Sequence, residues 1–331
     1  MRPHNTDNKN SFDDGPLSDL RSAHAIHIGS ASSPRWYRGS VSGLSAYLSN
    51  LQTWGAGAAE LVLHHGPATE QFRFVHVIEQ DWNATFAQYH ARGIACHAHA
   101  SLAPAFRLEG WHTDALFVQA QYTPLLAFCA RMAQREGRSV TMVLHGAGDT
   151  KATVQANQEA TRGFLHWAEG EILRLGGGVR IAIELLRARG ADDVHAASGR
   201  DKAMAVVRDC DPALVGICWD MEHDWFTGLR DPSWTPHPPD AFLNRVIHTH
   251  VHDAHGTTLA NHYPLVFNTV PYDGMVPPLV AHGYDGPLIL EIRYRHALSL
   301  GDPQFWMGQS YAVLHRLLTD TDRALRSGRP A

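Results

Sequence analysis

The stretch Val215-Gly-Ile-Cys-Trp-Asp220-Met-Glu-His223 decides the fold, because a short apolar run stops abruptly at acidic and imidazole side chains. Val179-Arg-Ile-Ala-Ile-Glu184 and Leu288-Ile-Leu-Glu291 end in the same way. Short apolar runs bounded by polar clusters are typical of buried β-strands. Such runs recur at eight places, at about 24–30, 59–65, 93–99, 139–145, 179–185, 214–220, 246–252 and 287–292.

The segments between these runs are long enough for helices. Helical periodicity is clearest at about 115–136, 153–175 and 308–326. Alternation of strands and helices predicts a parallel sheet with right-handed crossovers. Eight such cycles predict an α/β fold, a single-domain (β/α)8 TIM barrel, with its chemistry at the carboxyl ends of the strands.

The predicted barrel occupies residues 21–331 as one catalytic domain. Residues 1–20 are rich in Asn, Asp, Ser and Pro and are expected to form a disordered tail. Two long loops, at 227–240 and 253–278, follow strands that end in candidate ligands. Long loops in a compact domain are commonly functional, so we expect both to shape the pocket.

Composition excludes several classes of partner. The 331 residues are 44% hydrophobic, enough to bury a core, and the formal charge of -5 with scattered Lys and Arg argues against binding extended nucleic acid. The four cysteines show no CxxC pairing and are expected to be reduced and structural. No apolar run approaches the ~20 residues needed to span a bilayer, and the start of the chain lacks a signal-peptide core. A cytoplasmic enzyme with a small polar substrate is predicted, either monomeric or as a homo-oligomer.

Candidate metal ligands stand at the ends of the fifth to eighth strands: Glu184, Asp220, His250 and Glu291. Carboxylates and an imidazole form a mixed oxygen and nitrogen shell that suits Zn, Mn or Co. We expect one metal site, and the sequence leaves undecided whether there is a second. The alternative for any one of these residues is a polar strand end or an ion pair at the barrel mouth.

Asp220 and His223 form an Asp-x-x-His pair where a strand turns into a helix. Three residues are nearly one helical turn, so both side chains can point into the mouth. The alternative is an Asp220 that caps the helix and a His223 that faces solvent.

These motifs together resemble the xylose-isomerase-like barrel superfamily: "RIAIE" ending at Glu184, "CWDMEH", "HTHVHDA", "NHYPLVFNTVPYDGMVPPL" and "GYDGPLILEIR". The resemblance covers about residues 22–320. The superfamily contains sugar isomerases and epimerases, inosose dehydratases and endonuclease-IV-type zinc phosphodiesterases. The resemblance implies the same four metal ligands, with His223 binding either substrate or a further zinc.

Additional histidines resemble zinc ligands of the endonuclease-IV branch. His99 and His145 end the third and fourth strands and, with Glu184, imply a second zinc. His262 resembles another ligand of that branch, but Ala260 stands where that branch has an acidic residue, which argues against a third zinc. The alternative for His99 and His145 is a hydrogen-bonded pair of pocket histidines.

Other polar side chains adjoin these candidates. Because strand side chains alternate between faces, His97 shares a face with His99, and His248 and His252 share one with His250. We expect these histidines to orient ligands or line the pocket. The residues assigned to substrate binding are His64, His223, His252 and Arg293, where Arg293 is suited to a carboxylate or phosphate; His65 adjoins this set.

The sequence leaves the reaction open. In the first hypothesis Glu184 and Glu291 remove and return a proton on a small sugar- or polyol-like carbonyl compound, as an isomerase or epimerase, or as a dehydratase with the same first step. The second is hydrolysis of a small phosphoester by two zinc ions, without a role in DNA repair. A catalytically silent metal- or sugar-binding protein is the third, and the intact ligand set opposes it.

Overall fold

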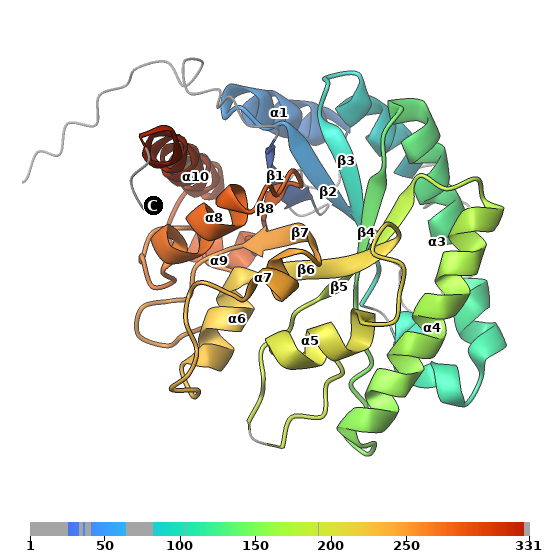
Figure 1. The fold of residues 1–331 in the computed structure, drawn as a ribbon. Coiled ribbons are helices and arrows are strands. Elements are labelled where there is room, and N and C mark those ends of the chain that lie inside the picture. Colours follow the sequence, from blue (N-terminus) through green and yellow to red (C-terminus); the bar gives the residue numbers. More distant parts are fainter. Residues whose placement is uncertain are drawn as a thin grey trace, which may run out of the picture.

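A computed structural model describes residues 26–32, 36, 41–63, 82–102, 104–190 and 192–327. Within these residues, eight parallel strands close into a barrel in sequence order, with β8 pairing back onto β1, so the predicted TIM barrel is confirmed (Figure 1). The strands are β1 (Ile28–Ser32), β2 (Ala58–Val62), β3 (Ala95–His99), β4 (Val140–His145), β5 (Val179–Glu184), β6 (Val215–Asp220), β7 (Val246–Val251) and β8 (Leu288–Leu290).

Helices surround the strands, with α3 and α4 on one side of the molecule and α1 and α10 on another (Figure 1). The α-helices include α1 (Val41–Thr53), α3 (Ala115–Glu136), α4 (Val154–Arg174), α5 (Arg200–Val207), α6 (Met221–Gly228), α7 (Asp240–Leu243), α8 (Tyr272–Ala281), α9 (Tyr294–Ser299) and α10 (Pro303–Arg326). Residues 82–90, between β2 and β3, are helical as well. Two short 3-10 helices, η2 (Pro104–Phe106) and η3 (Leu108–His112), precede α3.

Side-chain caps explain where the long helices begin. Asp114 accepts a hydrogen bond from the backbone N–H of Phe117 at the start of α3, and Thr153 caps α4 in the same way. The last helix begins at Pro303, earlier than the predicted 308, because Asp302 caps it and proline is suited to the first helical turn.

The loop predicted at 253–278 contains the beginning of a helix. Helix α8 starts at Tyr272 and includes Pro277 and Pro278, which had favoured a loop. Its buried face, which includes Met275, Val276 and Leu279, packs against the core, and this burial outweighs the helix-breaking tendency of proline.

The main core lies between the strands and the surrounding helices, as in other TIM barrels. The barrel interior differs from the usual filling of Val, Ile and Leu. Small apolar groups, such as Val143, Ala182 and Cys218, share it with the buried polar side chains of Glu60 and His248. Buried polar groups must be hydrogen-bonded to be tolerated, so this interior is built around specific contacts.

Two further predictions concern the N-terminal tail and membrane-spanning helices. The predicted tail, residues 1–20, lies outside the described residues. Among the described helices, none combines the length and the apolar character that crossing a membrane requires.

Candidate metal centre

The ligand candidates come together at the barrel mouth because each stands at or near the carboxyl end of its strand. Glu184 and Asp220 are the last residues of β5 and β6. Asp220 pairs with His250 across β6 and β7, and His250 pairs with Ile289 of β8. Glu291 follows β8 directly and faces the same mouth.

Asp220 combines the two roles that the sequence left as alternatives. Its Oδ1 accepts a hydrogen bond from the backbone N–H of His223 at 2.9 Å and so caps helix α6. The other oxygen, Oδ2, lies 3.2 Å from Nδ1 of His223 and 3.0 Å from Nε2 of His252. His223 is buried and faces the site instead of solvent, because the capped first turn directs it back toward the strand ends.

Three carboxylates converge on one ring nitrogen. Nδ1 of His250 lies 3.7 Å from Oε1 of Glu184 and 3.3 Å from Oε2 of Glu291. The same nitrogen is 4.0 Å from Oδ2 of Asp220. Within the described residues, Nδ1 of His250 and Oε2 of Glu291 are buried and have no hydrogen-bond partner.

This arrangement fits a divalent cation. An unpartnered buried nitrogen and carboxylate oxygens are costly unless something satisfies them, and both are ordinary ligands of Zn or Mn. Separations of this size are what ligand atoms about 2.1 Å from one ion would have with respect to each other. Glu184, Asp220, His250 and Glu291 are therefore the residues that could hold the cation.

A second group adjoins the first through Glu184. Its Oε2 lies 3.1 Å from Nε2 of His99 and 2.8 Å from Nε2 of His145. The other nitrogen of His99, Nδ1, donates to the carbonyl of Ala100 at 2.7 Å. Together the three side chains could hold an additional metal ion.

The loop after β7 supplies another set of side chains. His262 adopts a positive φ of 59°, and its Nδ1 donates to the carbonyl of Glu291 at 3.0 Å. Nδ2 of Asn261 lies 3.2 Å from Nε2 of His223 on α6. Outside this loop, Arg187, which follows β5, donates to the carboxylate of Glu222 on α6. This strained loop conformation brings Asn261 and His262 to the barrel mouth.

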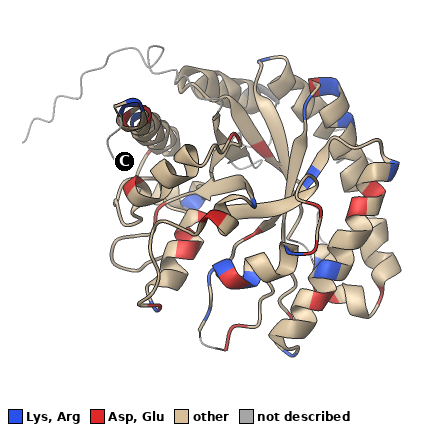
Figure 2. Cartoon of the chain, viewed as in Figure 1, with Lys and Arg blue, Asp and Glu red and all other residues tan. Residues whose placement is uncertain are grey.

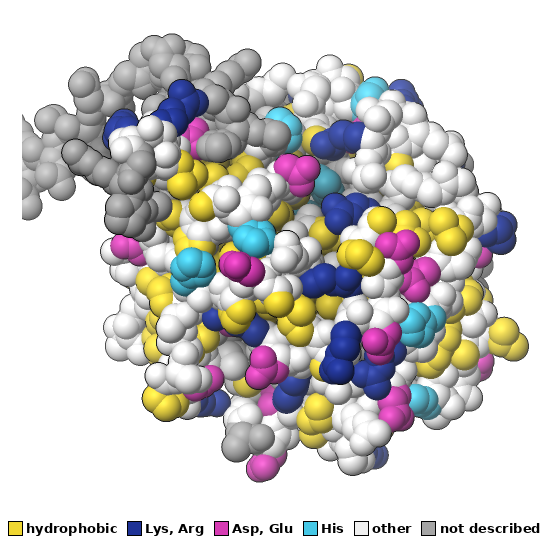
Figure 3. Space-filling view, viewed as in Figure 1, with side chains coloured by type: hydrophobic (Ala, Val, Ile, Leu, Met, Phe, Trp, Pro, Cys, Tyr) yellow, Lys and Arg dark blue, Asp and Glu magenta, His cyan; other side chains and the backbone are white. Residues whose placement is uncertain are grey.

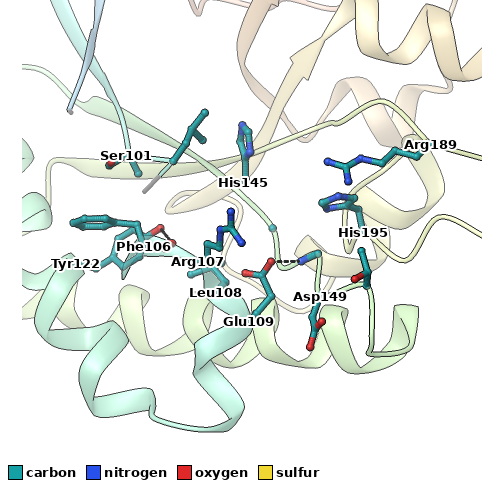
Figure 4. A pocket seen from close by; sticks show the side chains of 15 residues that line it. Ser101, Phe106, Arg107, Leu108, Glu109, Tyr122, His145, Asp149, Arg189 and His195 are labelled. Carbon is teal, nitrogen blue, oxygen red and sulfur yellow. Dashed lines mark hydrogen bonds between the residues drawn. The ribbon is translucent and has the colours of Figure 1, made fainter. Parts of the chain in front are cut away.

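A cavity of about 500 Å³ opens above the carboxylates. Glu184, His223 and Glu291 lie at its base, and its lining contains four arginines: Arg187, Arg189, Arg230 and Arg293. A second cavity of about 460 Å³ shares His145, Arg189 and His195 with it. Figure 4 shows Arg189 and His195 on one side of this second cavity and Phe106 and Tyr122 on the other.

Burial and crowding of like charges shift the pKa values at this site. Burial raises the pKa of Asp220 to about 7, although the imidazole of His223 opposes the shift. Burial also acts on Glu291, but His262 and His250 hold the pKa of this carboxyl below its usual range. Burial disfavours the charged form of His99, yet its hydrogen bond with Glu184 raises its pKa to about 9. Carboxylates this crowded favour a cation among them.

Glu60 is the residue that sequence reasoning missed. It lies in the middle of β2, fully buried, and its Oε2 is 2.9 Å from Nε2 of His248 and 3.0 Å from Nε2 of His250. The available signal was an acidic residue inside the apolar run Ala58-Ala-Glu-Leu-Val62. The interior-facing histidines of β7 could have suggested a partner for it.

The remaining predicted site residues have varied placements. Arg293 lines the cavity, whereas His64 and His65 lie outside the described residues. His97 is buried deeper, with Nδ1 accepting from the backbone N–H of Thr141.

His252, predicted to bind substrate, is placed differently. It is fully buried and absent from the cavity lining. Its Nδ1 accepts from the backbone N–H of His262, while Nε2 contacts Asp220, so both ring nitrogens are engaged. Its place near the carboxyl end of β7 suggested exposure, but the following loop folds over it.

Comparison with known proteins gives the same fold. Residues 48–317 match the family described as a xylose isomerase-like TIM barrel. The structure of L-ribulose 3-epimerase is similar with a TM-score of 0.64 and 13% identity, over 92% of this chain and 98% of that one. The apo structure of 3-keto-D-glucoside 4-epimerase, YcjR, from E. coli has a TM-score of 0.64 and 14% identity, over 88% and 99% of the two chains.

A third similar structure contains a metal. The IOLI protein with a bound zinc atom has a TM-score of 0.60 and 12% identity, over 89% of this chain and 98% of that one. No curated protein matches the sequence. At these identities the structural likenesses establish the fold.

Proposed function

Since the chain belongs to the xylose isomerase-like TIM barrel family, we propose that it is a divalent-metal-dependent isomerase or epimerase. The proposed reaction is proton transfer on a small hydroxylated carbonyl compound, such as a sugar or polyol derivative. The observation that carries the proposal is the convergence of Glu184, Asp220 and Glu291 on the unpartnered Nδ1 of His250 at the base of a cavity.

The chemistry divides between the cation and the protein side chains. A cation held by these four residues would polarise the carbonyl and adjacent hydroxyl oxygens of the substrate. Glu184 and Glu291 are the proposed bases, one removing the proton next to the carbonyl and the other returning it. Both carboxylates line the cavity, so both are within reach of a bound substrate.

Side chains around the cavity would orient the substrate. His223 lines it, and its Nε2 lies beside the amide of Asn261, a pairing suited to binding a hydroxyl group. Arg189, Arg230 and Arg293 have no carboxylate partner among the described residues, whereas Arg187 pairs with Glu222. Arg293 is the proposed contact for an acidic group of the substrate.

Deuterium exchange tests the reaction. The metal-loaded protein is incubated with L-ribulose, D-tagatose or D-psicose in heavy water. Proton NMR measures the signals of the protons on the carbons next to the carbonyl. We expect loss of a proton signal from at least one sugar, abolished by a chelator and restored by Mn²⁺, Co²⁺ or Zn²⁺. Absence of both exchange and new sugar products from all these sugars would count against the proposal.

Hydrolysis by two zinc ions is the second candidate function. The observation that favours it is the approach of His99 and His145 to one oxygen of Glu184. A paired-metal site of this kind would suit a small phosphoester. Zinc-dependent cleavage of bis(4-nitrophenyl) phosphate, without exchange of sugar protons, would favour it.

A further inference from the structure

Glu60 places a charged group where the barrel would ordinarily hold an aliphatic side chain. It is fully buried on β2, between Ala59 and Leu61, and does not line either cavity at the barrel mouth. Burying an isolated carboxylate costs several kcal/mol unless hydrogen bonds or opposite charge compensate it. The contacts of Glu60 should therefore show what compensates its burial and what role it has.

Those contacts run to the imidazoles of β7. Oε2 of Glu60 lies 3.0 Å from Nε2 of His250 and 2.9 Å from Nε2 of His248. Oε1 has no hydrogen-bond partner among the described side chains. One carboxylate oxygen thus accepts from two imidazoles that lie on the same face of one strand.

This contact determines which nitrogen of His250 is free. A neutral imidazole has one N–H and one lone pair, and the hydrogen bond made by one nitrogen sets the role of the other. Because Nε2 of His250 faces a carboxylate, it carries the proton and donates it. In this neutral tautomer Nδ1, on the opposite edge of the ring, holds the lone pair and faces Glu184, Asp220 and Glu291, where the cation would lie.

We infer that Glu60 is a positioning residue, which fixes the tautomer and ring orientation of His250 so that Nδ1 is presented to the cation. His248, two residues before His250 on β7, contacts the same oxygen of Glu60 and helps to hold it in place. Carboxylate partners of metal-binding histidines orient the ring and increase its basicity. The inference rests on the cation of the proposed function, but not on which reaction the site performs.

The ionised form of Glu60 is the one that suits this role, because its Oε2 faces two ring nitrogens. The carboxylate form can accept hydrogen bonds from both rings, whereas a protonated carboxyl would compete as a donor.

Metal affinity, measured without turnover, tests the inference. Competition against a chromophoric chelator gives the Zn²⁺ affinity of the wild type, Glu60→Gln and Glu60→Ala. Gln keeps an acceptor oxygen without the charge and should weaken binding ~10-fold, whereas Ala removes the acceptor and should weaken it up to ~100-fold.

A buried carboxylate that accepts hydrogen bonds from none of the candidate ligands is the matched control. Asp224 is buried and accepts from Arg200, Trp219 and Trp234, none of which is a candidate ligand. Asp224→Asn should lower the melting temperature while the Zn²⁺ affinity stays within ~3-fold of wild type. A purely structural Glu60 would behave in the same way.

The outcomes separate this inference from the proposed function. A wild type that binds no divalent cation would overturn the metal site and the inference together. A wild type that binds Zn²⁺, with Glu60→Gln and Glu60→Ala folded and within ~3-fold of its affinity, would overturn the inference alone. If Glu60→Ala fails to fold, the nearly isosteric Glu60→Gln decides on the same criterion.

Discussion

At the scale of single residues, Glu184 and Glu291 carry most of the proposed chemistry. Replacing either with Gln keeps its size but removes a metal ligand and a base. We expect turnover to fall by at least ~10²-fold in each variant, the loss typical of a deleted general base. Circular dichroism should stay unchanged, because neither substitution alters the side-chain volume.

The matched control for this pair is Glu171→Gln. Glu171 lies on α4, and its ion-pair partner within the described residues is Arg174, in an exposed contact that contributes little to stability. This variant should retain wild-type turnover. Full activity in Glu184→Gln or Glu291→Gln would contradict the assignment of the site.

His99 and His145 decide between the two candidate functions. Under proton transfer they line the pocket beside Glu184, so the variant His99→Ala with His145→Ala should keep the primary metal and lose activity only modestly. Under hydrolysis by two zinc ions, the same variant should lose one metal equivalent and at least ~100-fold in rate. Elemental analysis of protein purified without chelator measures the metal content in both proteins.

The cysteines give a prediction that is independent of the metal. All four are free and buried, and burial raises the pKa values of Cys129 and Cys210 to about 12. The thiolate is the reactive form, so at pH 9 only ~10⁻³ of each of these two thiols is ionised, compared with about three quarters of an unperturbed thiol. Folded protein should resist alkylation between pH 7 and 9, and denaturant should release all four thiols. Rapid labelling of the folded chain would contradict this burial.

At the scale of elements, the strands could be predicted well and the connections less so. Strands β5 and β6 end at Glu184 and Asp220, as the abrupt change from apolar to acidic residues predicted. Helix α8 was missed because Pro277 and Pro278 favour a loop, and local sequence does not reveal how much of this segment tertiary packing buries.

The site residues, too, could be predicted only in part. The four ligand candidates could be found because each ends a strand, and strand ends converge by topology. The role of Glu60 could not be predicted in this way. Its partners His248 and His250 lie 188 and 190 positions away in the sequence, and β2 and β7 face each other only because the barrel closes. The burial of His252 could not be predicted either, because a sequence does not show which strand end a loop covers.

Strand packing around the site can be probed with one glycine. A Cβ atom at Gly216 on β6 would lie 2.6 Å from the backbone oxygen of Arg245 and 2.7 Å from Ile247. The backbone oxygen of Arg245 cannot move aside as the end of a flexible side chain can, so Gly216→Ala should destabilise the protein by ~1–3 kcal/mol. Urea unfolding measures this free energy.

A glycine with free space provides the matched comparison. Gly170 lies inside α4, and a Cβ there would meet nothing within 4 Å. Gly170→Ala should stabilise the protein by ~0.5–1 kcal/mol, because alanine has the higher helix propensity. Equal effects of the two substitutions would contradict the close approach of β6 and β7.

At the scale of the whole molecule, charge distribution bears on the choice of partner. Figure 2 shows Lys and Arg interleaved with Asp and Glu over the surrounding helices, and Figure 3 shows both signs intermingled on the visible face. The arginines of the cavity lie above a carboxylate-lined base, an arrangement suited to a small ligand. A long phosphate backbone would need a continuous basic surface instead.

The final prediction follows from this distribution. Binding to nucleic acid gains most of its free energy from release of counterions, and a chain with a net charge of -5 and dispersed basic residues offers little of it. A gel-shift assay with duplex DNA containing an abasic site should therefore show no complex at physiological salt, with zinc present or absent. The same protein should still exchange sugar protons in heavy water. Tight, salt-sensitive binding to the abasic duplex would reverse this assignment, and it would favour a nucleic-acid phosphodiester as the substrate of the carboxylate and histidine cluster.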